Sequence, residues 1–209
     1  MSITTYDELK TAVARWLKRD DLTAYIPDYI TLAEERIWHG DEGQFPTPAL
    51  RYFVNESQDS GTSTLGGIVA LPSDYLSTLS FYITSGGIKR ELRYITPQQY
   101  AQKANDSGLP NYYTIKVGSI YMAGTTDCAF THDYYRPLTA LSSSNTSNGL
   151  LTSHPGIYLD AACLEGAKDT MNWPLADRFA SSLRGKIISL MRTSKDMPAG
   201  GSMAVTVGR

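Results

Sequence analysis

The side chains of this sequence that could do chemistry are mainly carboxylates. The candidates for an acid and base pair are Glu34, Glu35, Asp41, Glu42 and Glu165. Glycoside hydrolysis uses such a pair, with one carboxyl group protonated and the other ionised. Adjacent acids on a helix more often form a solvated face, so the pattern alone favours a structural interpretation.

Other catalytic patterns are missing from the sequence. It contains no GxxxxGK[ST] phosphate loop, no GxGxxG after a predicted strand and no HExxH metal motif. His39, His132 and His154 are far apart, so only the fold could assemble a metal site from them. Cys128 and Cys163 have no neighbouring histidine to activate a thiolate. We therefore expect no enzyme activity and no cofactor or metal.

Length and composition narrow the class of protein. The chain has 209 residues, 42% hydrophobic, with a formal net charge of -2. This length allows one compact domain or a domain with an insertion. The charge is too small for a protein that wraps phosphate backbones. No segment approaches the roughly 20 apolar residues of a membrane helix, and the N-terminus lacks a signal-peptide pattern, so we expect synthesis in a reducing cytoplasm.

Tyrosine is unusually frequent, with 14 tyrosines against 5 phenylalanines. Tyrosine suits subunit interfaces, because it buries apolar area and keeps a hydroxyl group at its edge. It is also a good β-former, so a strand-rich domain explains the same composition.

Residues 1–44 are predicted to form the N-terminal helices. Thr5 and Glu8 have the spacing of a capping box, in which each side chain binds a free backbone N–H group of the other residue. Apolar residues then recur at helical spacing, so one face is apolar: Leu9, Val13, Trp16 and Leu17. A second helix should begin near Pro27 and end by Gly40 or Gly43.

Residues 45–138 are predicted to form a β-rich insertion. Gly86-Gly87 and Val117-Gly118 indicate tight turns, and Thr96-Pro97 indicates the start of a short helix. The strand candidates are Arg51–Asn55, Gly67–Leu71, Leu76–Thr84, Lys89–Ile95, Tyr112–Val117, Ser119–Ala123 and Ala129–Arg136.

The polar residues 139–153 are predicted to form a flexible loop. Helical spacing returns over residues 154–196, with helices beginning at Pro155 and Pro174. The predicted fold class is α+β: a helical bundle from the N- and C-terminal helices, with a β-rich insertion and an extended C-terminal arm.

The arm is residues 197–209. Met203, Val205 and Val207 alternate with smaller residues, which is the period of a strand. Such a strand could pair within its own domain or add to the sheet edge of a partner.

The order of several segments resembles a known family. The segments are Thr5–Leu9, Ala24–Ile30, Leu32–Ile37, Leu71–Leu76, Ile95–Pro97, Gly108–Tyr113, Tyr134–Leu138, Leu150–Thr152 and Glu165–Ala167. In this order they are similar to the head-to-tail adaptor, or connector, proteins of tailed bacteriophages, especially the short-tailed type. The resemblance covers the chain from Thr4 to about Leu190.

The resemblance implies a structural function. Adaptors of this family form a ring, generally of twelve copies, beneath the portal protein of the virion. A tail nozzle or tube binds the other side, and DNA passes through without specific binding. The C-terminal arm reaches the portal, so the expected docking residues are Met197, Met203, Val205, Val207 and Arg209. The resemblance implies no catalytic residues, no membrane partner, and assembly after synthesis in the bacterial host cytoplasm.

Two other functions remain open from the residues. The first is a cell-wall glycoside hydrolase that uses two of the carboxylates. The second is a non-enzymatic, β-rich recognition module that acts as a monomer.

Overall fold

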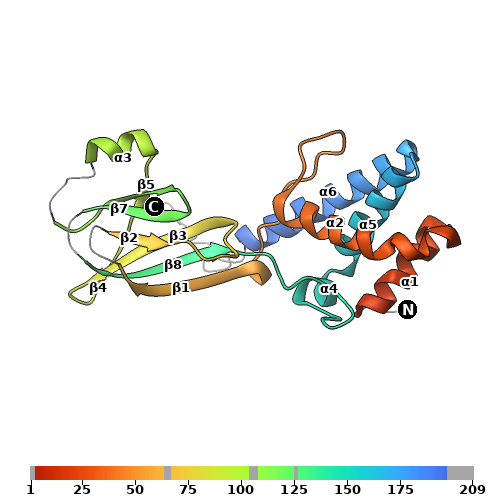
Figure 1. Cartoon of the computed structure of the whole chain (residues 1–209), viewed down its shortest axis with the longest axis horizontal. Helices are drawn as coiled ribbons and strands as arrows, with labels where there is room; N and C mark the ends of the chain where they lie inside the picture. The colour runs from red at the N-terminus through yellow and green to blue at the C-terminus, as the bar shows by residue number, and fades with distance from the viewer. Residues whose placement is uncertain (1–2, 64–66, 104–107, 125–126, 197–209) are drawn as a thin grey trace, which may run out of the picture. The chain divides into compact units, whose positions relative to one another are not determined.

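The computed structural model describes residues 3–63, 67–103, 108–124 and 127–196 (Figure 1). The chain forms two compact units. One comprises Met1–Asn55 and Leu138–Arg209, and the other comprises Glu56–Pro137. The fold class is α+β, with six α-helices and two sheets among the described residues.

The first unit is helical. Its α1 begins with the predicted capping box, in which Glu8 N donates to Thr5 Oγ1 and Thr5 N donates to Glu8 Oε2. α2 has Pro27 in its first turn and is capped at its C-terminus by Gly40, whose φ of 75° suits glycine. The helices are α1 (Tyr6–Leu17), α2 (Ile26–His39), α4 (Gly149–Ser153), α5 (Pro155–Asp169) and α6 (Trp173–Asp196).

α5 is the most buried helix of this unit. Every residue from Ile157 to Ala167 is buried, and the helix packs against α1, α2, α4 and α6. Gly166 lets α1 and α2 approach closely, because a Cβ atom there would lie 2.6 Å from Leu17 Cδ1 and 3.2 Å from the Tyr29 ring. A helix buried on so many sides fixes the positions of its neighbours.

The structure differs from the predicted flexible loop at 139–153. The last five residues of that segment form α4. Asn148 caps this helix, accepting a hydrogen bond from Leu151 N at 3.0 Å, and its amide group donates to the Tyr158 hydroxyl at 2.7 Å. Thr146 O accepts a hydrogen bond from Tyr6 N, at the start of α1. Polar side chains in this segment form hydrogen bonds with backbone groups. The number of polar residues alone cannot show whether they bind the backbone in this way or face solvent.

Residues 45–55 also differ from the sequence analysis, which assigns them to the insertion. They belong to the helical unit, since Leu50 is fully buried and its N–H group donates to Ile37 O. The strand predicted at Arg51–Asn55 is wrong. Phe53–Asn55 is a short 3-10 helix, because the Asn55 side chain accepts a hydrogen bond from Tyr52 N and turns the chain.

The second unit contains two four-stranded sheets. The first has the order β1 (Glu56–Thr62), β8 (Ala129–Tyr135), β3 (Ser77–Ser85) and β4 (Ile88–Glu91). The second has the order β2 (Ile68–Ala70), β7 (Ser119–Ala123), β6 (Tyr112–Lys116) and β5 (Arg93–Tyr94). Neighbouring strands are antiparallel, except for the parallel pair β5 and β6.

The two sheets share one hydrophobic core. Phe81 and Phe130 from the first sheet join Tyr113, Ile120 and Met122 from the second. Alternating residues of β3, β7 and β8 contribute to it, as expected for sheets with one buried face. The core therefore makes the insertion a folded unit with its own interior.

The predicted turns of this unit are confirmed. Gly86 and Gly87, between β3 and β4, have φ values of 57° and 80°. Val117 and Gly118, between β6 and β7, have φ values of 49° and 68°. Two positive φ angles in succession match the twist of a hairpin. The predicted short helix is α3 (Pro97–Lys103), which Thr96 and Gln99 cap reciprocally.

Candidate functional site

The predicted docking residues lie at the C-terminal end of the chain. Met197, Met203, Val205, Val207 and Arg209 all fall outside the described residues. The structure describes the helix that precedes them, α6. A cavity of about 580 Å³ lies beside its later turns, lined by Tyr52, His154, Gly156, Ile157, Gly185, Lys186, Ser189, Leu190 and Thr193.

Glu34, one of the candidate catalytic acids, is buried in the helical unit. Its Oε1 accepts a hydrogen bond from Leu141 N at 2.9 Å and another from the Tyr158 hydroxyl at 3.2 Å. Burial raises the pKa of this carboxyl group, while both hydrogen bonds act in the opposite direction. These contacts join α2, α5 and the segment before α4, so Glu34 has a structural role.

Glu165 is also buried, and it is bound by two cations. Its Oε1 accepts from Arg36 Nε at 2.6 Å, and its Oε2 accepts from Lys168 Nζ at 2.7 Å. Arg36 is itself only 5% exposed and forms a second ion pair with Asp41 at 2.6 Å. Its Nη1 also donates to Phe45 O at 3.0 Å. This ion cluster connects α2, α5 and the loop after α2.

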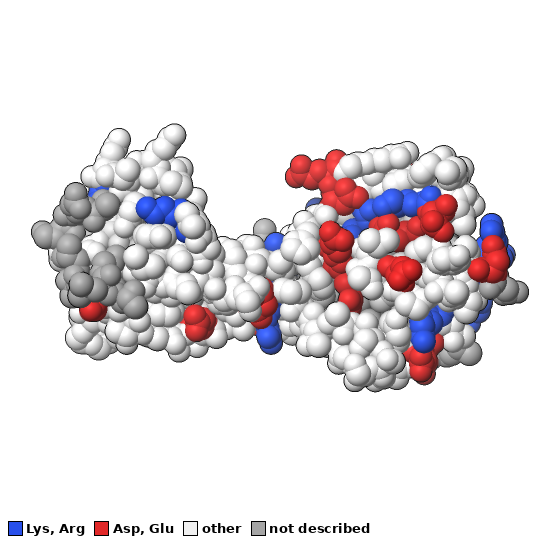
Figure 2. All heavy atoms as spheres, viewed as in Figure 1, with Lys and Arg blue, Asp and Glu red and all other residues white. Residues whose placement is uncertain are grey.

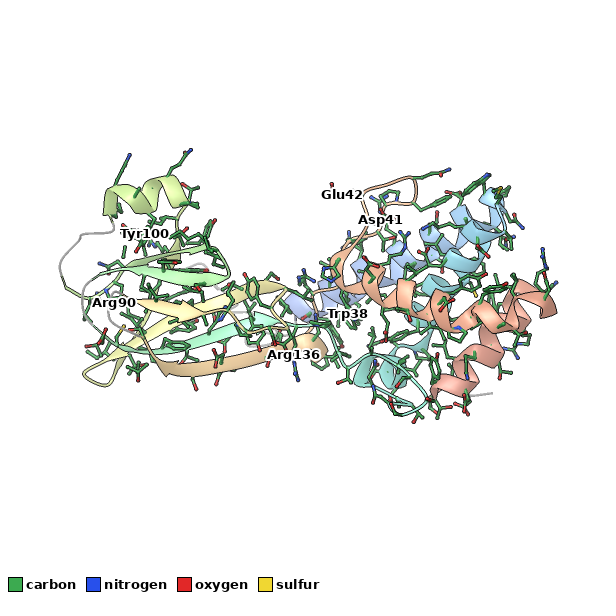
Figure 3. The ribbon with its side chains drawn as sticks, in the orientation of Figure 1. Trp38, Asp41, Glu42, Arg90, Tyr100 and Arg136 are labelled. Carbon is green, nitrogen blue, oxygen red and sulfur yellow. The ribbon has the colours of Figure 1, made fainter. Side chains whose placement is uncertain are left out.

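Asp41 and Glu42 follow α2 on that loop (Figure 3). A backbone hydrogen bond from Gly43, with help from the Arg36 charge, holds the pKa of Asp41 below its usual value. Glu35 and Glu42 are exposed and form no ion pair within the described residues. The candidate carboxylates are thus either held by structural partners or exposed to solvent, which does not match a pair of opposed catalytic acids.

The histidines and cysteines lie in separate environments. His39 is exposed at the end of α2, and the ring of His154 contacts Tyr52 edge-on. His132 is fully buried in the sheet unit, where its Nε2 lies 3.1 Å from Thr78 Oγ1. Desolvation raises the pKa of both buried thiols, Cys128 and Cys163. In the parts of the chain that the structure describes, no group of three or more His, Cys, Asp or Glu side chains could hold a metal ion.

Large hydrophobic residues are exposed on the helical unit, which the sequence analysis did not predict. Trp16 on α1 is 50% exposed, and Leu32 on α2 is 47% exposed. The periodicity of α1 suggested a core position for Trp16, because Trp16 lies next to the buried Leu17 on the same apolar stripe. Only the packing of α1 against α5 and α6 shows that part of the Trp16 ring faces outward.

A groove lies between Trp16 and α6. The Trp16 ring centroid is 6.2 Å from that of Phe179, with the two rings tilted by 54°. Together with side chains of α5 and α6, they enclose about 380 Å³, lined by Trp16, Asp160, Leu175, Arg178, Phe179, Ser182 and Lys186. An apolar floor with polar edges is also the arrangement found in protein–protein interfaces.

Comparison with known proteins identifies one family. The family model described as SU10 adaptor protein matches residues 4–206. No curated protein matches the chain. Among the described residues, no helix has both the length and the apolar character needed to cross a membrane.

Proposed function

The chain belongs to the SU10 adaptor protein family, and from this premise we propose that its copies form a ring that joins the portal to the tail of a phage virion. The family match confirms the resemblance to head-to-tail adaptors. In the proposal, about twelve copies assemble beneath the portal, a tail nozzle or tube binds the opposite side, and DNA passes through the centre.

The single observation that carries this proposal is the extent of the family match. It runs from residue 4 to residue 206, so it includes both compact units and most of the C-terminal segment. A structural adaptor also needs no catalytic centre. The buried carboxylates Glu34 and Glu165 accept hydrogen bonds that hold segments of the helical unit together, which agrees with a structural role.

We assign portal docking to the arm, Met197–Arg209. Burial of each apolar side chain contributes about 1.5–3 kcal/mol, whereas fixing the backbone costs about 1–2 kcal/mol per residue. These opposing contributions nearly cancel, so one arm should bind weakly. A ring presents many arms at once, and multivalent binding makes the whole attachment strong.

The helices serve as a bundle that positions the arm. The low net charge of -2 suits a channel that DNA must leave freely, because a strongly basic wall would retain phosphates. The protein joins the virion at the head-to-tail interface after synthesis in the host cytoplasm.

Mass measurement after mixing with the portal tests the proposal. The full-length chain should form a stoichiometric complex with a portal ring. A variant that ends at Asp196 should lose this complex while its circular dichroism spectrum and thermal midpoint stay unchanged. If the full-length chain does not bind the portal, the proposed function is wrong. If the shortened chain binds equally well, the arm is not the docking element.

A further inference from the structure

We propose that α2 of one copy docks against the groove beside Trp16 of the next copy, and that this contact joins neighbours in the ring. The proposal rests on the proposed ring and specifies which surfaces meet. The first surface, here called the α2 stripe, consists of Asp28, Leu32 and Glu35. The second, here called the α1/α6 groove, is lined by Trp16, Asp160, Leu175, Arg178, Phe179, Ser182 and Lys186.

The α2 stripe has an apolar centre between two acids. Asp28, Leu32 and Glu35 recur at spacings of four and three residues, so they lie along one side of the helix. All three are exposed, and neither acid forms an ion pair within the described part of the chain. Figure 2 shows acidic side chains at several places on the helical unit, with basic side chains among them.

The nearby cations do not neutralise the stripe. Arg36, the only basic residue of α2 before His39, is turned inward to Glu165 and Asp41. Lys168 on α5 is bound by Glu165 at 2.7 Å. The two exposed acids of the stripe therefore lack a positive partner among the described residues, and a neighbouring copy can supply one.

The α1/α6 groove has the complementary chemistry. Its floor is apolar, formed by Trp16, Leu175 and Phe179, and it can receive a leucine side chain. Arg178 is exposed at its edge and forms no ion pair within the described residues.

The one acid of the groove is already neutralised. Asp160 is 5% exposed, and its Oδ2 accepts from Ser182 Oγ at 2.6 Å and from Lys186 Nζ at 2.5 Å. Arg178 thus leaves the groove with an unbalanced positive charge. An apolar side chain flanked by acids fits an apolar floor with a cation at its edge.

The two surfaces suit a ring because they share no residue. A contact between two different surfaces of identical chains repeats from copy to copy and closes into a ring when the rotation allows it. Along the α2 axis, Asp28 lies about 6 Å from Leu32, and Glu35 about 4.5 Å beyond it. Glu35 is the nearer acid to Leu32 along the axis, so in the proposed contact Glu35 pairs with Arg178 when Leu32 enters the groove.

A charge-swap experiment tests the contact. We would prepare Arg178→Glu, Glu35→Arg and the double variant in the full-length chain, with Lys89→Glu as a matched charge reversal at an exposed site of the other unit. The measurement is the number of copies that load on the portal ring, by mass, as a function of concentration. Thermal midpoints of the free chains check that each variant folds.

We expect each single reversal to raise the concentration for half-maximal loading at least tenfold, because repulsion replaces attraction at every contact of the ring. The double variant should recover most of the loading, and Lys89→Glu should behave as the original chain. Normal loading by both single variants, or no recovery in the double variant, overturns the proposed contact. If the unmodified chain fails to load at all, the ring itself is wrong, and the contact is wrong with it.

Discussion

At the scale of single residues, Arg36 binds groups that are distant in the sequence. Glu165 is 129 positions away, and the Phe45 carbonyl group is nine positions away. A buried charge of this kind is costly unless it is paired with an opposite charge and hydrogen-bonded. Arg36 meets that requirement with two carboxylates and a backbone oxygen, so the cluster holds the loop after α2 against α5.

Replacing Glu165 with glutamine should destabilise the helical unit. Glu165→Gln leaves Arg36 with Asp41 as its only anion, and the free energy of unfolding should fall by about 3 kcal/mol. Glu35→Gln, at an exposed position, is the matched control and should change the free energy of unfolding by less than about 0.5 kcal/mol. Urea unfolding measures both. Equal effects of the two variants would show that the cluster does not stabilise the fold.

These residue-level contacts could not be predicted from spacing. Glu34 and Glu165 were identified as candidate acids because of their type, but their partners come from segments that only the fold brings together. The exposure of the Trp16 ring could not be predicted either, because Trp16 recurs at the same helical spacing as the buried residues of α1.

At the scale of elements, local signals predicted most helices and turns. Capping residues and prolines gave the starts of α1, α2, α3, α5 and α6 to within one or two residues, because these signals act within one turn of a helix. β1 was missed because its sequence, ESQDSGT, contains no apolar side chain. It is an edge strand held by pairing with β8, and pairing is a long-range property.

The segment before α5 offers a prediction at this scale. Asn148→Ala should lower the free energy of unfolding by about 2 kcal/mol, because it removes the cap of α4 and the hydrogen bond to Tyr158. Ser153→Ala, on the exposed side of the same short helix, should have an effect below about 0.5 kcal/mol. Chemical denaturation compares them. If Asn148→Ala lowers the free energy of unfolding no more than the control does, the contacts of Asn148 do not stabilise the fold and the segment is a flexible loop, as the sequence predicts.

At the scale of the whole molecule, the chain combines a helical unit and a β-rich unit, each with its own core. The sequence predicts both units, because its hydrophobic period changes from helical to strand-like and back again. It placed the boundary of the insertion at residue 45 instead of Glu56, since no local signal shows that residues 45–55 pack on α2. The docking arm stays a prediction.

A density map of the assembled virion vertex tests the central claim most directly. The account predicts a ring of this chain between portal and tail, with residues 197–209 of each copy in contact with the portal. It would be contradicted by a vertex that lacks this chain, or by density in which those residues fold back on their own copy and leave the portal untouched.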